Sequence, residues 1–599
     1  MARDISSDDI RLVLESGLFD ADWYREQYPD VAKLGMDAVE HYLWLGWRLG
    51  RDPGPNFSTQ DYLDKNSNVA SSGVNPLLHH IRHGRSRISL LAKRSPEQVA
   101  NNESVGFSVI MPTKNRRYCI QKAVDSLISQ THRNFELIIV DDGSTDDTEE
   151  FIRRAYAKDI RGGRIVYIRL EQSQGVCSAR NIGLSIAQKK WISYLDSDNT
   201  VRPNFLTVFA DAIAKNPLAL TFYANFQVNE SGAIRGRPFN LKDLERNNYI
   251  DIGVFCHARD CYRNLGGFDP DLKRLVDWEL ILRYCKVHQP VHIPIVVMDY
   301  CNKDNPERIT RRESYAKANV QVHRKHRVRD TVSIVVPCYN QEKYIKRALD
   351  SAIQQKGDFT FEIIVSDDGS TDRTPEIIDE FCRKHPHSAR NISSRYNMGI
   401  SANFKRCFTE AAGEFVAVLE GDDYWESPEN LVEKIGFLRK NADCSMVFSK
   451  IQMLFENNGK PEVRYLDRQE KLKTNRLTGK HFIDDPDMNL IVNFSSCLFR
   501  ADLLRKLPYE AYHIRLSEIT VAFFMEKFGP IGYIDKPLTV YRHHGAGTWS
   551  GLSTPDKLRN AMKIRQIVKQ IASPQYRDEI EKIIARKYVA RLAEMEGAS

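Results

Sequence analysis

Apolar residues along the chain fall into two patterns. Short runs without polar residues, such as Val109–Met111 and Leu137–Val140, predict strands that are buried on both faces. Between them, Ile120, Val124 and Leu127 recur at the spacing of one helix face. Strand, helix and strand in this order predict a parallel α/β sheet covered by helices on both faces.

The same pattern occurs a second time further along the chain. Three blocks recur in the same order: SVIMPTKNR (108–116) as SIVVPCYNQ (333–341), ELIIVDDGSTDDT (136–148) as EIIVSDDGSTDRT (362–374), and KKWISYLDSDN (189–199) as GEFVAVLEGDDYW (413–425). Ordered repetition of several blocks predicts a duplicated domain.

Residues 18–90 hold a second, shorter repeat. Six residues recur 38 positions later: Phe19, Tyr24, Val31, Gly35, His41 and Gly46 as Phe57, Tyr62, Val69, Gly73, His79 and Gly84. Apolar residues at helical spacing in each unit predict paired short helices joined by glycine turns. His41 and His79 could bind a ligand, but a histidine at the same point of each repeat better fits a helix-packing position. We therefore expect an interaction or packing module here.

The predicted organisation has five parts. These are a helical repeat module at 1–90, a polar linker at 91–106, α/β domains at 107–330 and 331–552, and a C-terminal helical segment at 553–599. In the last segment, apolar residues at helical spacing lie among many Lys and Arg. Such helices either pack on the preceding domain or lie on a membrane surface.

Composition argues against several classes of protein. The 86 Lys and Arg nearly balance the 79 Asp and Glu, which gives a net charge of +7 over 599 residues without the concentrated basic face typical of nucleic-acid binding. The eleven cysteines form no CxxC pair, so we expect reduced thiols and neither a disulfide framework nor a zinc site. GxGxxG and the P-loop pattern are absent from both α/β domains, which argues against a dinucleotide oxidoreductase or a P-loop ATPase.

Two features bear on location. No stretch of about 18 apolar residues occurs, and the start, MARDISSDDIRLVLESG, has no charged-then-apolar leader pattern. We expect a cytoplasmic protein that is at most peripheral at the inner face of the plasma membrane.

Acidic clusters follow the predicted strands, where an α/β sheet places its ligands. Asp196 and Asp198 come directly after the run Trp191–Leu195. Carboxylates at positions i and i+2 repel each other unless a cation lies between them, and a hard divalent ion with oxygen ligands is the natural partner. A single DxD more often forms a solvated turn or a helix cap. The second copy, Glu420 and Asp422, favours a metal–diphosphate site.

The other acidic cluster is the repeated DDGSTD. Asp141 and Asp142 precede a Gly-Ser-Thr turn in which Thr145 or Asp146 can cap the next helix. That capping leaves Asp142, and Asp368 in the second copy, free to hydrogen-bond a base edge or a ribose.

These motifs resemble those of family-2 glycosyltransferases of the nucleotide-binding GT-A fold. The resemblance rests on the PTKN/PCYN strand ends, the VDDGSTD/SDDGSTD turns, GVCSARNIGL at 175–184 and the DSD/EGDD elements, and it covers about 107–310 and 332–552. It implies two GT-A (Rossmann-like) α/β domains in tandem, flanked by the helical repeats and the helical tail. The tandem arrangement is similar to that of bacterial polysaccharide-assembly enzymes, and the repeats are similar to modules attached to bacterial glycosyltransferases.

The resemblance also assigns site residues. It implies a nucleotide-sugar site for the uracil or uridine part of the donor, built from Pro112, Thr113, Asp141, Asp142, Arg180, Pro337, Tyr339, Asp367 and Asp368. It implies Mg²⁺ or Mn²⁺ at Asp198 and Asp422, with Asp196, Glu420 and His544 nearby. The general bases would be Asp277, in GGFDPDLKRLVDWELILR (266–283), and Glu518, in RLSEITVAFFMEKFGPIGYID (515–535).

The two halves depart from the family pattern in different ways. The first half has Lys303 where His544 would align, and Lys303 or Arg308 could offset the diphosphate charge instead. The second half has Glu420 and Glu518 where aspartate is usual, so one of the two sites could be altered or inactive.

The implied reaction is inverting transfer, in which an acceptor hydroxyl attacks the anomeric carbon and Asp277 or Glu518 takes its proton. We expect a bifunctional enzyme that adds sugars from nucleotide sugars, UDP-sugars first of all, to a growing bacterial polysaccharide or lipid-linked glycan, beside other assembly proteins. One alternative keeps a single active half with the other as a glycan-binding scaffold. Another is a non-catalytic nucleotide-sugar sensor. Trp278 and Trp425 fit buried packing better than stacking on sugars.

Overall fold

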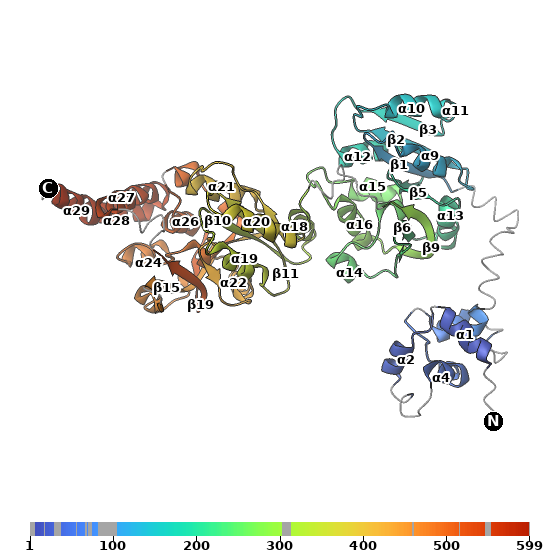
Figure 1. Ribbon diagram of the computed structural model, residues 1–599, viewed down its shortest axis with the longest axis horizontal. Helices are drawn as coiled ribbons and strands as arrows, with labels where there is room; N and C mark the ends of the chain where they lie inside the picture. Colours follow the sequence, from blue (N-terminus) through green and yellow to red (C-terminus); the bar gives the residue numbers. More distant parts are fainter. Residues whose placement is uncertain are drawn as a thin grey trace. The chain divides into compact units, whose positions relative to one another are not determined.

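Figure 1 shows the computed structural model of the chain. The structure describes residues 6–16, 18–28, 31, 37–55, 57–65, 69, 75–81, 105–301, 313–457, 460–513, 515–544 and 553–597. The chain divides into two units, Met1–Val105 and Gly106–Ser599. Among the described helices, none combines the length and the apolar character needed to cross a membrane. All eleven cysteines lie within the described ranges, where none of them forms a disulfide.

The first unit is helical. Its elements are α1 (Ser7–Glu15), α2 (Ala21–Gln27), α4 (Ala38–Trp44), η1 (Gly46–Leu49) and α5 (Thr59–Lys65). In each repeat a tyrosine hydroxyl meets a histidine ring: Tyr24 Oη lies 3.1 Å from His41 Nδ1, and Tyr62 Oη lies 2.9 Å from His79 Nδ1. Tyr24 and His41 are buried, so this histidine pairs within the helix packing of the unit.

The second unit contains two mixed α/β sheets in tandem. The first is built from β1 (Phe107–Thr113), β2 (Phe135–Asp141), β3 (Ile165–Arg169), β4 (Trp191–Tyr194), β5 (Thr200–Val201), β6 (Thr221–Val228), β7 (Ile234–Arg235), β8 (Phe255–Ala258) and β9 (Val291–Tyr300). The second is built from β10 (Asp330–Cys338), β11 (Phe359–Asp367), β12 (Ala389–Asn391), β13 (Phe415–Val418), β14 (Tyr424–Trp425), β15 (Met446–Asn457), β16 (Lys460–Tyr465), β17 (Arg476–Leu477), β18 (Cys497–Arg500) and β19 (Ile531–His543).

Both sheets have the same strand order. The first runs β3-β2-β1-β4-β8-β6-β9-β5, and the second runs β12-β11-β10-β13-β18-β15-β19-β14. The first four strands of each order are parallel, as the unbroken apolar runs predict. The next strands, β8 and β18, pair antiparallel with β4 and β13. The predicted α/β class is confirmed, but the sheets are mixed rather than wholly parallel.

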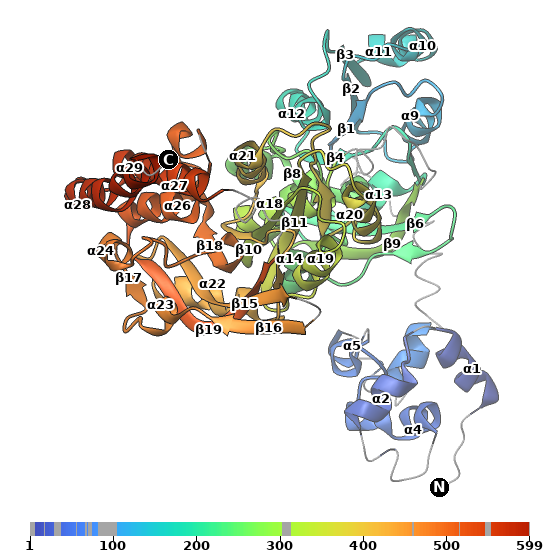
Figure 2. The ribbon, with the colours of Figure 1, turned by 60° about the vertical axis from the view of Figure 1, so that its left-hand side comes forward.

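Helices cover both faces of each sheet. The first half has α9 (Ile120–Ile128), α10 (Thr148–Ala155), α11 (Ala157–Arg161), α12 (Val176–Ile186), α13 (Phe205–Lys215), α14 (Leu241–Arg246), η2 (Ile252–Val254), α15 (Arg259–Leu265), α16 (Val276–Val287) and the joining helix α18 (Tyr315–His326). The second half has α19 (Ile345–Ile353), α20 (Thr374–Lys384), α21 (Ile400–Glu410), α22 (Asn430–Lys440), α23 (Asp467–Glu470), α24 (Gly479–Asp484), η3 (Phe494–Ser496), α25 (Ala501–Leu504), η4 (Tyr509–Tyr512), α26 (Glu518–Met525) and η5 (Glu526–Phe528). In Figures 1 and 2, α9 and α12 lie on opposite sides of β1 and β2.

The strand order creates a switch point in each sheet. The chain runs outward from β1 through β2 to β3 and then returns to place β4 on the other side of β1. In open α/β sheets, ligands bind at such a switch point, outside the carboxyl ends of the strands. The acidic motifs follow β2 and β4, or β11 and β13, at this edge of each sheet.

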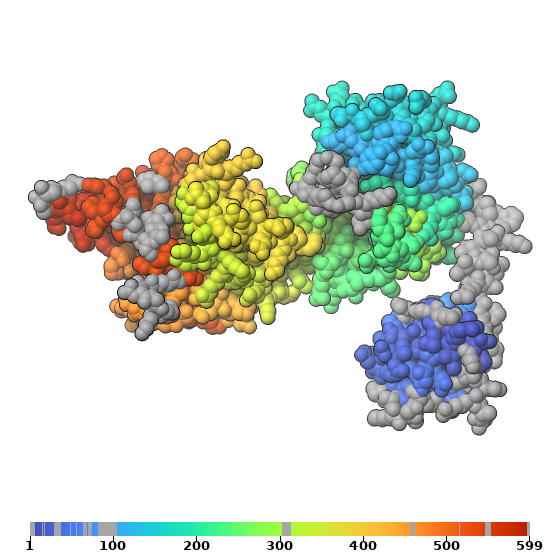
Figure 3. Space-filling view, viewed as in Figure 1, coloured from blue at the N-terminus to red at the C-terminus, as the bar shows by residue number. Residues whose placement is uncertain are grey.

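The tail forms α27 (Thr554–Ile571), η6 (Pro574–Tyr576), α28 (Arg577–Ile583), η7 (Ile584–Val589) and α29 (Ala590–Gly597). Its apolar side chains, including Ile564, Val568 and Ile580, belong to the main apolar core of the second half. In Figure 3 the red surface of these helices adjoins the orange surface of that half. These side chains pack on the preceding domain and are therefore not available to a membrane.

Candidate active site

The strand-end turns are closed by an asparagine in a left-handed conformation. Asn115 has a φ of 50° and Asn340 a φ of 52°, a region that asparagine enters more readily than most residues. The Oδ1 atom of each accepts a hydrogen bond at 2.8 Å, from Thr145 N and from Thr371 N respectively. The PTKN and PCYN motifs thus tie the first strand of each sheet to the DDGSTD turn. Neither asparagine was among the predicted site residues, although the repeated P-x-x-N spacing marks both.

The first aspartate of each DDGSTD motif closes its own turn. Asp141 accepts hydrogen bonds from Ser144 N at 2.8 Å and from Tyr167 Oη at 2.6 Å. Asp367 likewise accepts one from Ser370 N at 2.9 Å. Both carboxylates are buried. A contact from either of them to a nucleotide stays a prediction.

The second aspartate holds the loop that leads into the next helix. Asp142 accepts hydrogen bonds from Ser173 Oγ at 2.7 Å and from Gly175 N at 3.0 Å, and Asp368 accepts one from Gly399 N at 2.8 Å. The two glycines have φ values of 91° and 88°, which lets the chain turn into α12 and α21. The sequence predicted that both carboxylates are free. They are instead engaged with backbone N–H groups, because the loop folds back onto them.

The other predicted nucleotide-sugar residues lie at the same strand ends. Thr113 is the last residue of β1, pairs in register with Asp141, and accepts a hydrogen bond from Asp142 N at 2.8 Å. Pro112 and Pro337 are buried within their strands, whereas Tyr339 exposes its ring just past β10.

In the first half, a buried arginine joins the predicted metal ligand to the predicted base. Arg180 on α12 donates from Nη2 to Asp196 Oδ1 at 2.8 Å and from Nη1 to Asp277 Oδ1 at 2.5 Å. Its side chain is 4% exposed, so the two ion pairs lie largely out of water. Asp277 is the second residue of α16; burial raises the pKa of its carboxyl, and Arg180 opposes that rise. The fold thus brings together three predicted residues from distant parts of the sequence.

A further carboxylate, Asp251, belongs to this site and was not predicted. It accepts a hydrogen bond from Gly253 N at 2.8 Å and begins η2. Burial, followed by the negative charge of Asp196, raises the pKa of Asp251 to about 7. In the sequence it is an ordinary helix-capping aspartate, and only the fold places it beside the DxD carboxylate.

The second half builds the corresponding site with different residues. Phe404 takes the place of Arg180, since each is the fifth residue of its helix after the capping glycine. Asn493 takes the place of Asp251, and its side chain accepts a hydrogen bond from Ser495 N at 2.7 Å to begin η3. An arginine and an aspartate are thus exchanged for two uncharged residues. The second site also gains a carboxylate, because Asp423 stands where the first half has Asn199.

A buried carboxylate outside the predicted set, Asp423, lies at the centre of the second site. It accepts hydrogen bonds from Asn493 Nδ2 at 2.8 Å, Ser495 Oγ at 2.7 Å and Arg542 N at 3.0 Å. Burial, followed by the charge of Asp422, raises the pKa of Asp423 to about 8. Asp423 was not predicted because it directly follows Asp422 of the DxD motif. The sequence does not indicate which of two consecutive aspartates has a buried side chain.

Two of the predicted metal ligands of the second half, Glu420 and Asp422, lie close to Asp423. Glu420 accepts a hydrogen bond from Asn493 Nδ2 at 3.0 Å. Burial, then the charges of Asp423 and Asp422, raise the pKa of Glu420 well above its usual range. His544 Nε2 lies 3.1 Å from Asp422 Oδ2, so the structure brings these two predicted residues together.

Asp198 of the first half is partly exposed and lies near Cys119, whose pKa is raised to about 11 by burial and then by the Asp198 charge. Lys303 and Arg308, the predicted first-half substitutes for His544, lie outside the described residues. Within the described ranges, no three His, Cys, Asp or Glu side chains converge into a ready-made metal centre.

The base candidate of the second half has its own arginine. Glu518 begins α26, and burial raises its pKa to about 7 while Arg515 opposes the rise. The motif RLSE that ends at Glu518 matches RLVD that ends at Asp277. In the first half, however, Arg274 of that motif donates to Glu313 O at 2.8 Å. Each base therefore has an arginine nearby, but from a different element.

The two tryptophans next to the acids have packing roles. Both are buried; Trp278 Nε1 donates to Leu244 O at 2.6 Å, and Trp425 Nε1 donates to Ser495 O at 2.8 Å. The favoured packing interpretation is confirmed.

Parts of this chain are similar in sequence to other proteins. An uncharacterized protein of Mycobacterium tuberculosis (strain H37Rv) is 32% identical over 225 residues, which are 37% of this chain and 62% of that protein. Chondroitin synthase and hyaluronan synthase of Pasteurella multocida are 23% and 25% identical over 388 residues, which are 54% of this chain and 39% of each synthase. The chain therefore spans less than two thirds of the length of these relatives.

Solved structures are similar at low scores. S. aureus TarS (residues 1–349) in complex with UDP-GlcNAc has a TM-score of 0.32 at 19% identity, over 37% of this chain and 65% of that one. The mannosyltransferase PcManGT from Pyrobaculum calidifontis, in complex with GDP-Man and Mn²⁺, has a TM-score of 0.35 at 17% identity, over 45% and 74%. The fold assignment rests on the strand order and not on these similarities.

The family is settled by sequence. The profile described as Glycosyl transferase family 2 matches residues 108–262 and 333–499, one segment on each sheet and together more than half of the chain. The chain therefore belongs to glycosyl transferase family 2, with two such domains in tandem.

Proposed function

We propose that each half binds a nucleotide sugar, in the first instance a UDP-sugar, and transfers its sugar with inversion to an acceptor hydroxyl. The observation that supports this most is the shared guanidinium of Arg180, which bonds both Asp196 and Asp277. A general base has to reach the acceptor hydroxyl next to the departing diphosphate. One arginine that holds the base beside the DxD carboxylate provides that juxtaposition.

In this proposal the remaining residues divide the work. Asp142 and Asp368, on their ordered loops, hold the uridine of the donor with the strand-end residues Pro112, Thr113, Pro337 and Tyr339, and Asp141 and Asp367 shape the turn. Asp277 and Glu518 take the proton from the attacking hydroxyl, each from the first turn of its helix. His544, next to Asp422, stands near the diphosphate of the second site.

The carboxylates fit a divalent cation. Burial, and then the charges of Asp423 and Asp422, raise the pKa of Glu420. A hard cation with oxygen ligands would offset the repulsion among these carboxylates. Mg²⁺ or Mn²⁺ would be held by Asp198 in the first half and by Asp422 in the second. When bound, it supplies Lewis-acid stabilisation of the leaving diphosphate.

The acceptor in this proposal is a growing bacterial polysaccharide or a lipid-linked glycan. The similarity to a chondroitin synthase and a hyaluronan synthase supports polysaccharide assembly. A lipid-linked acceptor would bring the chain to the inner face of the plasma membrane.

A second candidate is favoured by one observation. Phe404 leaves the second half without the arginine clamp that joins base and DxD carboxylate in the first. The first half would then be the active transferase, and the second a glycan-binding scaffold.

The test is product analysis with each half disabled in turn. We expect Asp198→Ala and Asp422→Ala each to remove a different linkage, and a chelator to remove both until Mn²⁺ or Mg²⁺ is restored. Asp260→Ala, at an exposed surface ion pair, is the matched control. If only Asp198→Ala changes the products, the scaffold alternative is correct. Undiminished transfer in the chelator contradicts the metal.

A further inference from the structure

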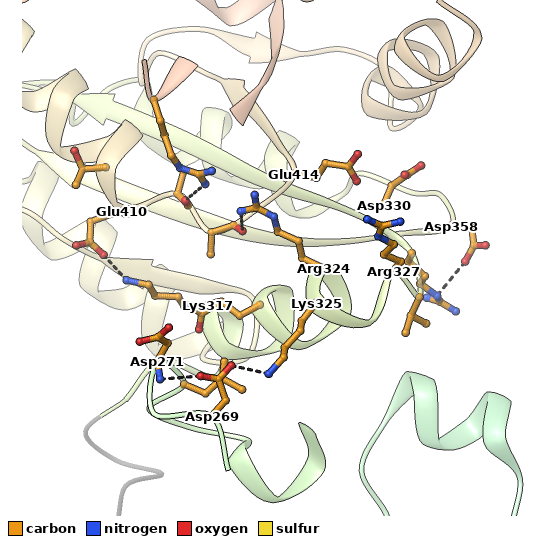
Figure 4. Close-up of a pocket in the computed structure, with 18 of the residues that line it drawn as sticks. Asp269, Asp271, Lys317, Arg324, Lys325, Arg327, Asp330, Asp358, Glu410 and Glu414 are labelled. Atoms are coloured by element: carbon orange, nitrogen blue, oxygen red, sulfur yellow. Dashed lines mark hydrogen bonds and ion pairs between the residues drawn. The ribbon is translucent and has the colours of Figure 1, made fainter. Parts of the chain in front are cut away.

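A groove of about 1160 Å³ lies beside the helix that joins the two halves. It is lined by α18, by the turn between α21 and β13, and by the loop that precedes α16 (Figure 4). The volume exceeds the roughly 300–1,000 Å³ of most small-molecule pockets. A groove of this size suits an extended ligand.

Several charges in the wall are neutralised within the protein. Lys325 Nζ lies 2.6 Å from Asp269 Oδ2, and Lys317 Nζ lies 2.8 Å from Glu410 Oε2 (Figure 4). These ion pairs fasten α18 to the loop before α16 on one side and to the end of α21 on the other. Because each lysine is paired with a carboxylate, these two ion pairs add no net charge to the wall.

Three arginines in the wall have no such partner. Within the residues that the structure describes, Arg324, Arg327 and Arg505 form no ion pair with a carboxylate. Arg324 Nη1 donates to Ala412 O at 3.1 Å, and Arg505 Nη2 donates to Ala411 O at 2.7 Å. These neighbouring carbonyls follow the end of α21, where a cation is favourable.

Each guanidinium caps a different carbonyl, and the two positive charges are thereby held close together. Burial, followed by the like charge of Arg324, lowers the pKa of Arg505. A guanidinium has five N–H donors, and the carbonyls engage only a minority of them. An oxyanion placed between the two groups would neutralise the repulsion and take up donors in the bidentate geometry that arginine favours.

One residue of α12 connects the groove wall with the site of the first half. Leu272, in its wall, accepts a weak hydrogen bond from Cys177 Sγ at 3.9 Å. Burial raises the pKa of the Cys177 thiol, and the charges of Asp277 and Asp269 add to the rise. One residue of α12 thus lies near both the groove wall and the proposed base.

We propose that this groove binds the acceptor, and that the acceptor is an anionic glycan whose carboxylate or phosphate groups pair with Arg324, Arg505 and Arg327. The inference rests on the proposed transferase function and names the acceptor class for it.

Calorimetric titration of the full chain without nucleotide sugar tests the proposal. The probes are a hexagalacturonate, which carries carboxylates, the neutral maltohexaose, and inorganic phosphate. We expect hexagalacturonate to bind, with an affinity that falls as salt rises, and Arg324→Gln with Arg505→Gln to weaken it about tenfold or more. Arg324→Lys with Arg505→Lys keeps the charges but loses the bidentate donors, so it should bind more tightly than the double glutamine variant and more weakly than the parent. Arg464→Gln, at an exposed arginine of the β15–β16 hairpin, is the matched control.

Three outcomes overturn the proposal: maltohexaose binds as tightly as hexagalacturonate, the double glutamine variant binds as well as the parent, or phosphate alone binds as tightly and marks a general oxyanion site. Failure of the proposed function is distinguishable. If the chain binds hexagalacturonate but transfers no sugar, the groove is an anionic-glycan site but not an acceptor site. If the chain transfers sugar to neutral acceptors alone, the proposed function is correct and the proposal for the groove is wrong.

Discussion

Phe404 stands in the second half at the position that Arg180 holds in the first. Arg180 Nη1 donates a hydrogen bond to Asp277 Oδ1 at 2.5 Å. The ring of Phe404 packs against that of Phe494 instead, with 5.1 Å between the ring centroids. The positive charge that opposes protonation of the second base comes from Arg515 instead. The two centres therefore share a topology but not an electrostatic arrangement, and substitutions should separate them.

Arg515→Gln should reduce transfer by the second half about tenfold or more and leave the first linkage unchanged, because a buried carboxylate that loses its counter-charge is strongly penalised. Arg274→Gln is the matched control, since it occupies the same motif position but donates to Glu313 O. Quantifying both linkages in the products measures the effect. Equal losses from the two variants would show that the motif arginine has one common role.

Transfer by the second half should depend on pH near neutrality. Burial raises the pKa of Glu518 to about 7, and a general base acts only when deprotonated. The rate should therefore reach a plateau above about pH 7 and fall about tenfold per pH unit well below it. Asp277→Asn silences the first half, so that kcat/KM from pH 5.5 to 9 reports Glu518 alone. A flat profile across that range would exclude Glu518 as the base.

The sequence and the fold each determine a different part of this picture. The strands β1 and β10 were predictable because burial on both faces requires unbroken apolar runs. Asp277 and Glu518 were singled out by their motifs RLVD and RLSE, and their role as general bases stays a prediction. Asp251 was not, because its place beside Asp196 depends on β8 pairing antiparallel with β4, and four residues carry no signal of strand direction.

The same limit explains why the antiparallel pairs around β8 and β18 were not predicted. It also explains why the exchange of Arg180 for Phe404 was not noticed. A substitution on the buried face of a helix looks like core packing in the sequence. Its effect on a carboxylate 97 positions away is visible only in three dimensions.

The left-handed turn at Asn340 gives a test of the strand-end geometry. Asn340→Leu should cost about 1–2 kcal/mol, since a branched side chain is strained at positive φ, and it also removes the acceptor for Thr371 N. Asn340→Asp keeps that acceptor and should behave nearly like the parent. Thermal unfolding and donor affinity are the measurements. An Asn340→Asp variant as damaged as Asn340→Leu would contradict the role of the Oδ1 bond.

Lys434 is an unusual core residue of the second half. Its side chain is 0% exposed, and Nζ has no hydrogen-bond partner in the described part of the chain. Phe209, also buried, occupies the same point of α13, where it packs edge to face on Phe205. Burial lowers the pKa of Lys434 from 10.5 to about 7.

Lys434→Met should therefore stabilise the fold, by about 1–3 kcal/mol near neutral pH. The folded state binds fewer protons than the unfolded state between pH 7 and 10.5, so the parent gains stability as pH rises through this range. Below about pH 7 the cost of the buried charge is complete, and near pH 10.5 it vanishes. Thermal unfolding at several pH values should show the advantage of the variant narrowing steadily above pH 7. Lys440→Met, at the exposed end of α22, is the control and should show no such trend. If Lys434→Met is less stable than the parent, or if its advantage does not change with pH, the Lys434 amine is paired and charged in the core.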